Sequence, residues 1–215
     1  MISKLPKVDK EIPLHPLGNP GTPVTLGTLY QSSPCLIFAI RNPFCILCRR
    51  TTYLMKQQIH KFKEFNVKVY CVIKEMINDE QLDLIHFDKS EVFIDLEMNL
   101  FKILGDADNR FRRTSSTFVF SHKVWTNVYN ATKEGFRMGY SSGEHFILGG
   151  SLLLSELGEI IYKSLENTPG EMPDIKGLLE ASEALYHQYD AADDYQTAIS
   201  PESFLSLGMD FSKIG

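Results

Sequence analysis

The chain has 215 residues, of which 43% are hydrophobic and 23% charged, and its formal net charge is -5. This length and composition predict a globular protein with one substantial core, and the negative charge argues against nucleic-acid binding. No apolar stretch approaches the roughly 18 residues of a membrane span, and the start of the chain lacks the apolar core of a secretory signal. We therefore expect a cytoplasmic protein without a membrane span.

The first part of the chain predicts an arm followed by a β-α-β unit. Five prolines among the first two dozen residues indicate an extended arm at residues 1–21. Residues 34–40, PCLIFAI, form the continuous apolar run that is typical of a fully buried strand. Apolar residues then recur at three- and four-residue steps over residues 49–66, which predicts a helix ending at Asn66. Residues 67–74 predict the second strand.

The rest of the chain continues this alternation. In chain order we expect a helix at residues 78–90, a strand at 91–97, a short helix at 97–105, an irregular insert at 106–143, a β-hairpin at 149–167 and a helix at 174–189. Within the insert, residues 116–135 fit either a helix or a hairpin, and the pattern favours the helix. The last residues are acidic and weakly patterned, so we expect a domain at 22–186 and a mobile tail at 187–215.

This order of elements predicts an α/β protein of the thioredoxin-like class. The β-α-β unit implies a right-handed parallel crossover, and the hairpin adds antiparallel strands. The expected fold is a central mixed sheet flanked by helices, with an irregular insert before the C-terminal β-hairpin.

Two cysteines carry the most specific chemical signal. Cys45 and Cys48 lie between the first buried strand and the helix that follows it. At a helix N-terminus the free N–H groups favour a thiolate, so Cys45 should have the lower pKa, helped by Arg41, Arg49 and Arg50 nearby. Cys48, in the first turn, can reach an oxidised Cys45 and form a disulfide with it.

Three uses fit this pair: a redox centre, half of a zinc site, or two ordinary core residues. A zinc site needs a second pair of ligands, but Cys35 and Cys71 fall within predicted buried strands and the six histidines show no paired spacing. The strand-to-helix position of the pair is that of a thioredoxin-like redox motif. The sequence therefore favours a redox pair over core cysteines and predicts no metal.

Several segments resemble one family. The segments RNPFCILCRR, VKVYCVIKE, VFIDLEMNLFKILG, GEHFILGGSLLL and EASEAL occur in the order and spacing of the peroxiredoxin-like 2 family, a thioredoxin-fold group related to AhpC/TSA antioxidant proteins. The resemblance spans residues 22–186 and looks closest to the redox-regulatory branch. It implies a thiol-dependent antioxidant or reductase activity with Cys45 and Cys48 as the redox pair. It also implies that Gly149 and Gly150, in FILGG, lie beside that pair.

These observations give a set of expected site residues. We expect Cys45 and Cys48 to be catalytic, and the substrate-binding or site-lining residues to be Arg41, Pro43, Phe44, Arg49, Gly149 and Gly150. The chain lacks the Pro-x-x-x-Thr/Ser-x-x-Cys element of true peroxiredoxins, so fast reduction of hydrogen peroxide is not expected. The apolar Ile46 and Leu47 between the cysteines suggest a lipid-like or protein substrate.

The expected function is a thiol oxidoreductase that reduces a peroxide, an endoperoxide or a disulfide. No dinucleotide-binding fingerprint occurs, so we expect no bound cofactor and an external electron donor, thioredoxin or glutathione. The alternative is a redox-sensitive protein-interaction module with little or no turnover. Such a module would present the loops around Phe44 and Gly149, or the tail, to a protein partner.

Overall fold

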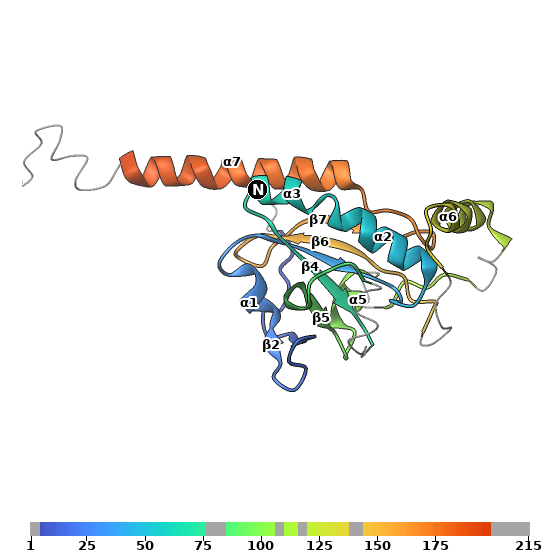
Figure 1. The fold of residues 1–215 in the computed structure, drawn as a ribbon. Helices are drawn as coiled ribbons and strands as arrows, with labels where there is room; N and C mark the ends of the chain where they lie inside the picture. Colours follow the sequence, from blue (N-terminus) through green and yellow to red (C-terminus); the bar gives the residue numbers. More distant parts are fainter. Residues whose placement is uncertain (1–4, 76–84, 106–109, 116–119, 138–143, 199–215) are drawn as a thin grey trace, which may run out of the picture.

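The computed structural model describes residues 5–75, 85–105, 110–115, 120–137 and 144–198. Within these ranges, seven strands form one sheet in the order β2-β1-β5-β4-β3-β6-β7 (Figure 1). The strands are β1 (Pro13–Pro16), β2 (Val24–Thr25), β3 (Cys35–Ala39), β4 (Lys68–Ile73), β5 (Val92–Ile94), β6 (Gly150–Leu154) and β7 (Ile160–Leu165).

The sheet is mixed, as the sequence predicted. The central strands β3, β4 and β5 are parallel, whereas β6 pairs with β3 and β7 pairs with β6 in antiparallel fashion. The register places Ala39, at the end of β3, opposite Gly150, at the start of β6. The predicted C-terminal β-hairpin is confirmed, and it brings the FILGG segment to the end of β3.

Helices cover both faces of the sheet. They are α1 (Leu26–Tyr30), α2 (Ile46–Lys56), α3 (Ile59–Glu64), α5 (Asn99–Ile103), α6 (His122–Lys133) and α7 (Ile175–Ala198), with a 3-10 turn, η1, at Lys89–Glu91. Helices α2, α3 and α7 lie on one face and α1 and α5 on the other, whereas α6 lies beside α2 at the end of the molecule (Figure 1). The predicted sheet flanked by helices is therefore confirmed.

The side chains of β3 show why its sequence is apolar throughout. Leu36 and Phe38 point into the core under α2, α3 and α7. Cys35, Ile37 and Ala39 point into the core on the opposite face. Since successive side chains of a strand alternate between the faces, a strand covered on both sides needs an unbroken apolar run.

Two predicted helices differ in the structure. The expected helix at 49–66 is divided into α2 and α3, because the Gln58 N–H bonds to the Met55 carbonyl, three residues back, and this tightens the turn. Asn66 has a φ of 56°, the left-handed conformation with which many helices end. Of the helix expected at 78–90, residues 78–84 lie outside the described part of the chain, and residues 85–88 are not helical. The helix favoured within 116–135 is confirmed as α6.

Both ends of the expected domain contain secondary structure that the sequence did not indicate. Pro13–Pro16, within the expected arm, forms β1, and each of its two prolines pairs with only one neighbouring strand. Helix α7 continues past residue 186 to Ala198, through an alanine-containing stretch with no glycine or proline to end it. The rest of the tail expected at 187–215, residues 199–215, lies outside the described residues, so the division of the chain stays a prediction.

Candidate functional site

A tight turn places Cys45 at the start of α2. The Asn42 side-chain oxygen accepts a hydrogen bond from the Phe44 N–H at 2.8 Å, and the Asn42 carbonyl accepts one from the Cys45 N–H at 3.2 Å. Cys45 is the N-cap residue, with extended backbone angles, and Cys48 lies in the first turn of the helix. The turn that follows β3 thus exposes part of Cys45 and buries Cys48 to 3% exposure.

Arg41 is the counter-ion of Cys45. Its Nη2 donates a hydrogen bond to the Cys45 sulfur at 3.1 Å, and the arginine is only 2% exposed. The pKa of Cys45 lies well below that of an ordinary thiol, because the Cys48 thiol donates a hydrogen bond to its sulfur and the Arg41 charge stabilises the anion. The backbone N–H groups of Cys48 and Leu47 also favour the thiolate. The same hydrogen bond, with burial, raises the pKa of Cys48.

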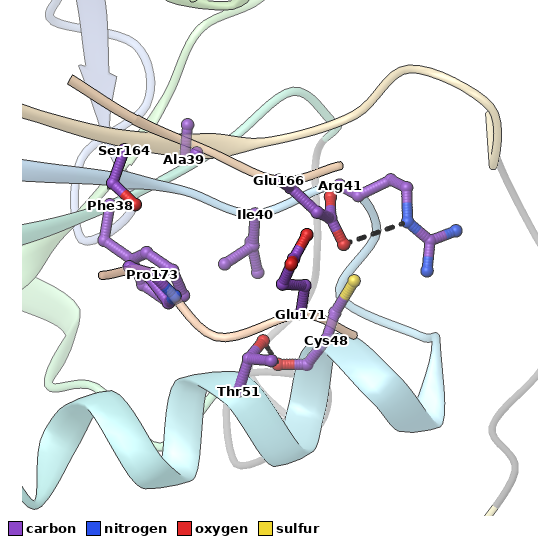
Figure 2. Close-up of a pocket in the computed structure, with 11 residues that line it drawn as sticks. Phe38, Ala39, Ile40, Arg41, Cys48, Thr51, Ser164, Glu166, Glu171 and Pro173 are labelled. Atoms are coloured by element: carbon purple, nitrogen blue, oxygen red, sulfur yellow. Dashed lines mark hydrogen bonds and ion pairs between the residues drawn. The ribbon is translucent and has the colours of Figure 1, made fainter. Parts of the chain in front are cut away.

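Glu166, directly after β7, lies on the other side of Arg41. Its Oε1 is 3.9 Å from Arg41 Nε, and its side chain is 11% exposed (Figure 2). Its carboxylate accepts hydrogen bonds from the N–H groups of Gly149 and Gly170 at 2.9 and 3.0 Å. Burial nevertheless raises the pKa of Glu166. Arg41 therefore lies between two acidic groups, the Cys45 thiol and the Glu166 carboxyl.

A small cavity connects Cys48 with the two glutamates of this region. It has a volume of about 20 Å³ and is lined by Arg41, Cys48, Thr51, Glu166 and Glu171, among others. The sulfur of Cys48 points towards Arg41 and Glu166 (Figure 2). A cavity of this size and polarity accommodates about one water molecule.

Lys74 fixes the backbone at Arg41. This lysine, 7% exposed at the end of β4, donates hydrogen bonds to the Arg41 carbonyl and, at 3.0 Å, to the Glu144 carbonyl. Its ammonium also pairs with the Glu144 carboxylate at 3.2 Å. The Arg41 guanidinium in turn donates from Nη1 to the His145 carbonyl at 2.8 Å. The segment before FILGG and the turn before α2 therefore hold each other in place.

The structure brings some of the expected site residues together and places others elsewhere. Pro43 is buried, and Phe44 is 6% exposed within the core under α2 and α3, so the Phe44 loop does not present its ring to a partner. Arg49 donates to the Arg137 carbonyl at 2.9 Å, beyond the end of α6. Arg50 makes a two-pronged ion pair with Glu134. Of the three arginines expected to stabilise the thiolate, only Arg41 bonds to the sulfur.

Gly149 and Gly150 lie at the site. A Cβ on Gly149 would be 2.1 Å from the Ala39 carbonyl oxygen, so only glycine allows the backbones to approach this closely. Gly149 also binds Glu166 through its N–H, and Gly150 lines the cavity with Cys48. The position that the family resemblance implied for FILGG agrees with this arrangement.

Helix α6 covers the two apolar residues between the cysteines. Ile46 and Leu47 are 3% and 4% exposed and form a small core with Val124 and Ala131 of α6. Ile46 and Leu47 therefore do not form an apolar surface at the site, which removes the reason for expecting a lipid-like or protein substrate from the sequence. A neighbouring helix buries them, which the local sequence does not reveal.

The remaining cysteines lie in the core. Cys35 and Cys71 are fully buried and point to opposite faces of the sheet, and burial raises the pKa of both thiols. Among the described residues, no group of three His, Cys, Asp or Glu side chains is arranged to hold a metal ion. No helix of the described part is long and apolar enough to cross a membrane.

Sequence reasoning missed the acidic and basic residues behind the pair. Glu166 lies near the end of the predicted hairpin, and Lys74 is the last residue of a predicted strand. The sequence signal that could have indicated these residues is a charged residue directly next to a buried strand. This signal does not show which strand ends lie close together in the fold.

Solved structures share the fold at low sequence identity. AhpC of Enterococcus faecalis aligns with a TM-score of 0.55 at 16% identity, over 89% of this chain and 96% of that one. A Xanthomonas campestris bacterioferritin comigratory protein, studied for its alkyl peroxide reduction activity, aligns with a TM-score of 0.55 at 14% identity, over 86% and 96%. These matches confirm a thioredoxin-like fold of the peroxiredoxin type.

Comparison of sequences identifies the family. Proteins named Peroxiredoxin-like 2A are 29% identical in Bos taurus, over 77% of this chain and 73% of that protein, and 27% identical in Gallus gallus, over 82% and 76%. The family described as AhpC/TSA antioxidant enzyme matches residues 54–168, a range that contains Lys74, Gly149 and Glu166 but begins after Cys48. The predicted family is confirmed: the chain belongs to the family described as AhpC/TSA antioxidant enzyme, with Peroxiredoxin-like 2A proteins among its relatives.

Proposed function

We propose that the protein is a thiol oxidoreductase in which Cys45 reduces a peroxide and Cys48 then closes a disulfide with it. The observation that carries this proposal is the 3.1 Å hydrogen bond from the buried Arg41 to a cysteine at a helix N-cap. A thiolate, not a thiol, attacks peroxides and disulfides. The arrangement keeps Cys45 ionised at neutral pH and keeps Cys48 protonated beside it.

The burial of the two sulfurs divides their roles. Cys45 is partly exposed and attacks one oxygen of the peroxide, so that the O–O bond breaks, an alcohol leaves with a proton from solvent, and Cys45 becomes a sulfenic acid. Cys48 is buried next to it and attacks the sulfenic sulfur, which forms the disulfide and releases water. Two thiols of an external donor, thioredoxin or glutathione, then reduce the disulfide.

An organic hydroperoxide is the first substrate class to test. One protein of the same fold was studied for alkyl peroxide reduction, and an alkyl peroxide matches the expectation from the sequence that hydrogen peroxide is a poor substrate. Endoperoxides and protein disulfides are the other candidates. All of them need the same nucleophile, so the cysteine variants test the proposal for each class.

The test is turnover of cumene hydroperoxide with thioredoxin or glutathione as donor. Cys45→Ser should lose all turnover. Cys48→Ser should consume about one equivalent of peroxide and stop, leaving a Cys45 sulfenic acid that dimedone labels. Cys35→Ala, which removes a core thiol far from the solvent, serves as control and should keep most of the activity.

Two results would contradict the proposal. If Cys45→Ser turned over as fast as the wild type, Cys45 would not be the nucleophile. If neither a sulfenic acid nor a disulfide formed in the wild type with any of the three substrate classes, the pair would not be a redox centre. The redox-sensitive interaction module would then be the better assignment.

A further inference from the structure

The closing of the disulfide raises a question about one proton. In the reduced protein the Cys48 thiol donates its hydrogen bond to the Cys45 sulfur, and burial further disfavours loss of the proton. Once Cys45 has been oxidised to a sulfenic acid, it no longer has an anionic sulfur to accept this hydrogen bond. Cys48 must still lose this proton to act as a nucleophile, and it is 3% exposed, so solvent reaches it poorly.

The cavity behind the pair contains a base suited to this proton. Glu166 lines the same cavity of about 20 Å³ as Cys48, and the Cys48 sulfur points to that side (Figure 2). The cavity accommodates about one water molecule, which can relay a proton over a distance that a direct hydrogen bond does not cover. Two backbone N–H groups, those of Gly149 and Gly170, hold the carboxylate in place.

We propose that Glu166 accepts the proton of Cys48 when the disulfide closes. This inference rests on the proposed function, because it concerns the second step of that reaction. As Cys48 transfers its proton to Glu166, its sulfur attacks the sulfenic sulfur of Cys45 and the S–O bond breaks. The hydroxide that leaves takes up the proton, becomes water, and returns Glu166 to its ionised form. The Cys48 sulfur is oxidised and the sulfenic sulfur is reduced, so electrons and protons balance.

The surroundings of Glu166 suit a base that works near neutral pH. The charged and titratable groups that face it from neighbouring segments are Arg41, Cys45, Cys48 and Glu171, and its backbone carbonyl accepts a hydrogen bond from Arg112. Burial raises the pKa of Glu166, while Arg41 keeps the ionised form accessible. A carboxylate with a raised pKa is a stronger base than an exposed one.

Glu171 is the natural control because it lines the same cavity but differs in its environment. It is exposed, and its carboxylate accepts hydrogen bonds from the N–H groups of Asn167 and Thr168 at 2.8 and 3.1 Å. The carboxylate that pairs with Arg41 is that of Glu166. Glu171→Gln therefore removes one carboxylate from the cavity without removing the proposed proton acceptor.

The experiment measures the rate of disulfide closure against pH. Reduced protein is mixed with one equivalent of cumene hydroperoxide and quenched with acid, and mass spectrometry counts the sulfenic acid and the disulfide. Glu166→Gln should close about 100-fold more slowly at pH 7, which is within the usual range for the loss of a general base. Its rate should rise about tenfold per pH unit as hydroxide takes over, whereas the wild-type rate levels off once Glu166 is ionised. Glu171→Gln should stay within about twofold of the wild type.

A second variant separates proton transfer from a structural role. Glu166→Asp keeps a carboxylate, so it should keep the levelled pH profile of the wild type at a lower rate. If Glu166→Gln formed the sulfenic acid and closed with the wild-type rate and profile, or was slower by the same factor at every pH, this inference would be wrong and the proposed function would stand. If the wild type formed no disulfide, the proposed function itself would fail.

Discussion

Arg41 links the parts of the site at the scale of single residues. Its guanidinium bonds to the Cys45 sulfur and the His145 carbonyl and lies 3.9 Å from Glu166, while its carbonyl accepts from Lys74. A charged group buried this deeply is stable only with such partners. The residue therefore serves both the ionisation of Cys45 and the position of the turn that carries it.

Replacing Arg41 should raise the pKa of Cys45. In the wild type, alkylation of Cys45 by iodoacetamide should stay close to its maximum rate at pH 6, where less than about 1% of an ordinary thiol of pKa 8.5 is ionised. Arg41→Gln should slow alkylation at pH 6 at least about tenfold, because the charge that stabilises the thiolate is gone. The ionisation can be checked independently by thiolate absorbance at 240 nm.

Lys56→Gln is the matched control for that experiment. Lys56 is a cation at the other end of α2, where it pairs with Asp88 and Glu91 and is remote from the sulfur. Its replacement should leave the alkylation profile unchanged. If Arg41→Gln also left the profile unchanged while the protein stayed folded, Arg41 would not be the counter-ion of Cys45.

The sequence was sufficient to predict the positions of Cys45 and Cys48, but not to predict which residues distant along the chain lie beside them. The positions of Cys45 and Cys48 follow from a buried strand and a helix that adjoin them, so a local pattern was enough. Glu166 reaches the site only because β6 and β7 return alongside β3. Arg49 bonds to the Arg137 carbonyl and not to the Cys45 sulfur, because spacing on a helix does not show which residue a neighbouring element will bind.

At the scale of elements, α6 acts as a cover over the start of α2. Val124 and Ala131 bury Ile46 and Leu47, and Arg50 binds Glu134 across the two helices. The Glu134 side chain of that ion pair is 40% exposed, so the pair contributes little, about 0 to 1 kcal/mol. The apolar contact is therefore the main interaction that holds α6 against α2.

Weakening the apolar contact should expose the buried cysteine. Val124→Ala removes the two γ-methyl groups of a residue that is 4% exposed, and should lower the free energy of unfolding by about 1 to 3 kcal/mol in urea denaturation. Alkylation of Cys48 in the folded protein should become faster. Thr132→Ala, an exposed position on the same helix, should change neither quantity. Equal Cys48 labelling in Val124→Ala and the wild type would show that α6 does not limit access.

The element that the sequence described least well was the one that covers the site. Buried strands such as β3 were recognisable because both of their faces are apolar. Helix α6 was only favoured over a hairpin, since its apolar face is short and it presents exposed aromatic side chains, Trp125 and Tyr129, on its other face. Its docking on α2 is a long-range contact, and no local pattern encodes it.

At the scale of the whole molecule, the ionised Cys45 links stability to pH. The folded reduced protein lowers the pKa of this thiol, whereas the unfolded chain has a value of about 8.5. Between the two values the unfolded state binds a proton that the folded state does not. Acid therefore favours unfolding, so the stabilisation is complete above about pH 8.5 and declines as the pH falls towards the pKa of Cys45.

Urea denaturation of the reduced protein at pH 8.5 and 6.5 measures this contribution. The free energy of unfolding changes by at most about 1.4 kcal/mol per pH unit for one proton. From pH 8.5 to 6.5 it should therefore fall by up to about 2.7 kcal/mol more in the wild type than in Cys45→Ser. The comparison with Cys45→Ser cancels the titration of the groups that do not contact Cys45. An equal loss in both proteins would mean that the folded structure does not favour the thiolate.

The overall architecture was predictable from the sequence, but the elements near the two ends of the described chain, β1 and the last part of α7, were not. The β-α-β unit and the final hairpin have strong local patterns, and they fix the mixed sheet. Strand β1 carries two prolines and pairs through only four residues, so its place next to β5 depends on contacts that the sequence does not display. The same is true of the far end of α7, where composition alone suggested a tail.

The opposite orientations of Cys35 and Cys71 give the protein an internal reference for counting thiols. Because these two side chains lie on different sides of the sheet, they cannot join each other. Of the four cysteines in the chain, only Cys45 and Cys48 can then form an intramolecular disulfide and so change the number of free thiols. Titration of the unfolded protein with a chromogenic thiol reagent therefore reports the state of the site: four free thiols per chain when the pair is reduced, and two when it has formed the disulfide. The redox state can be read in this way from unmodified wild-type protein.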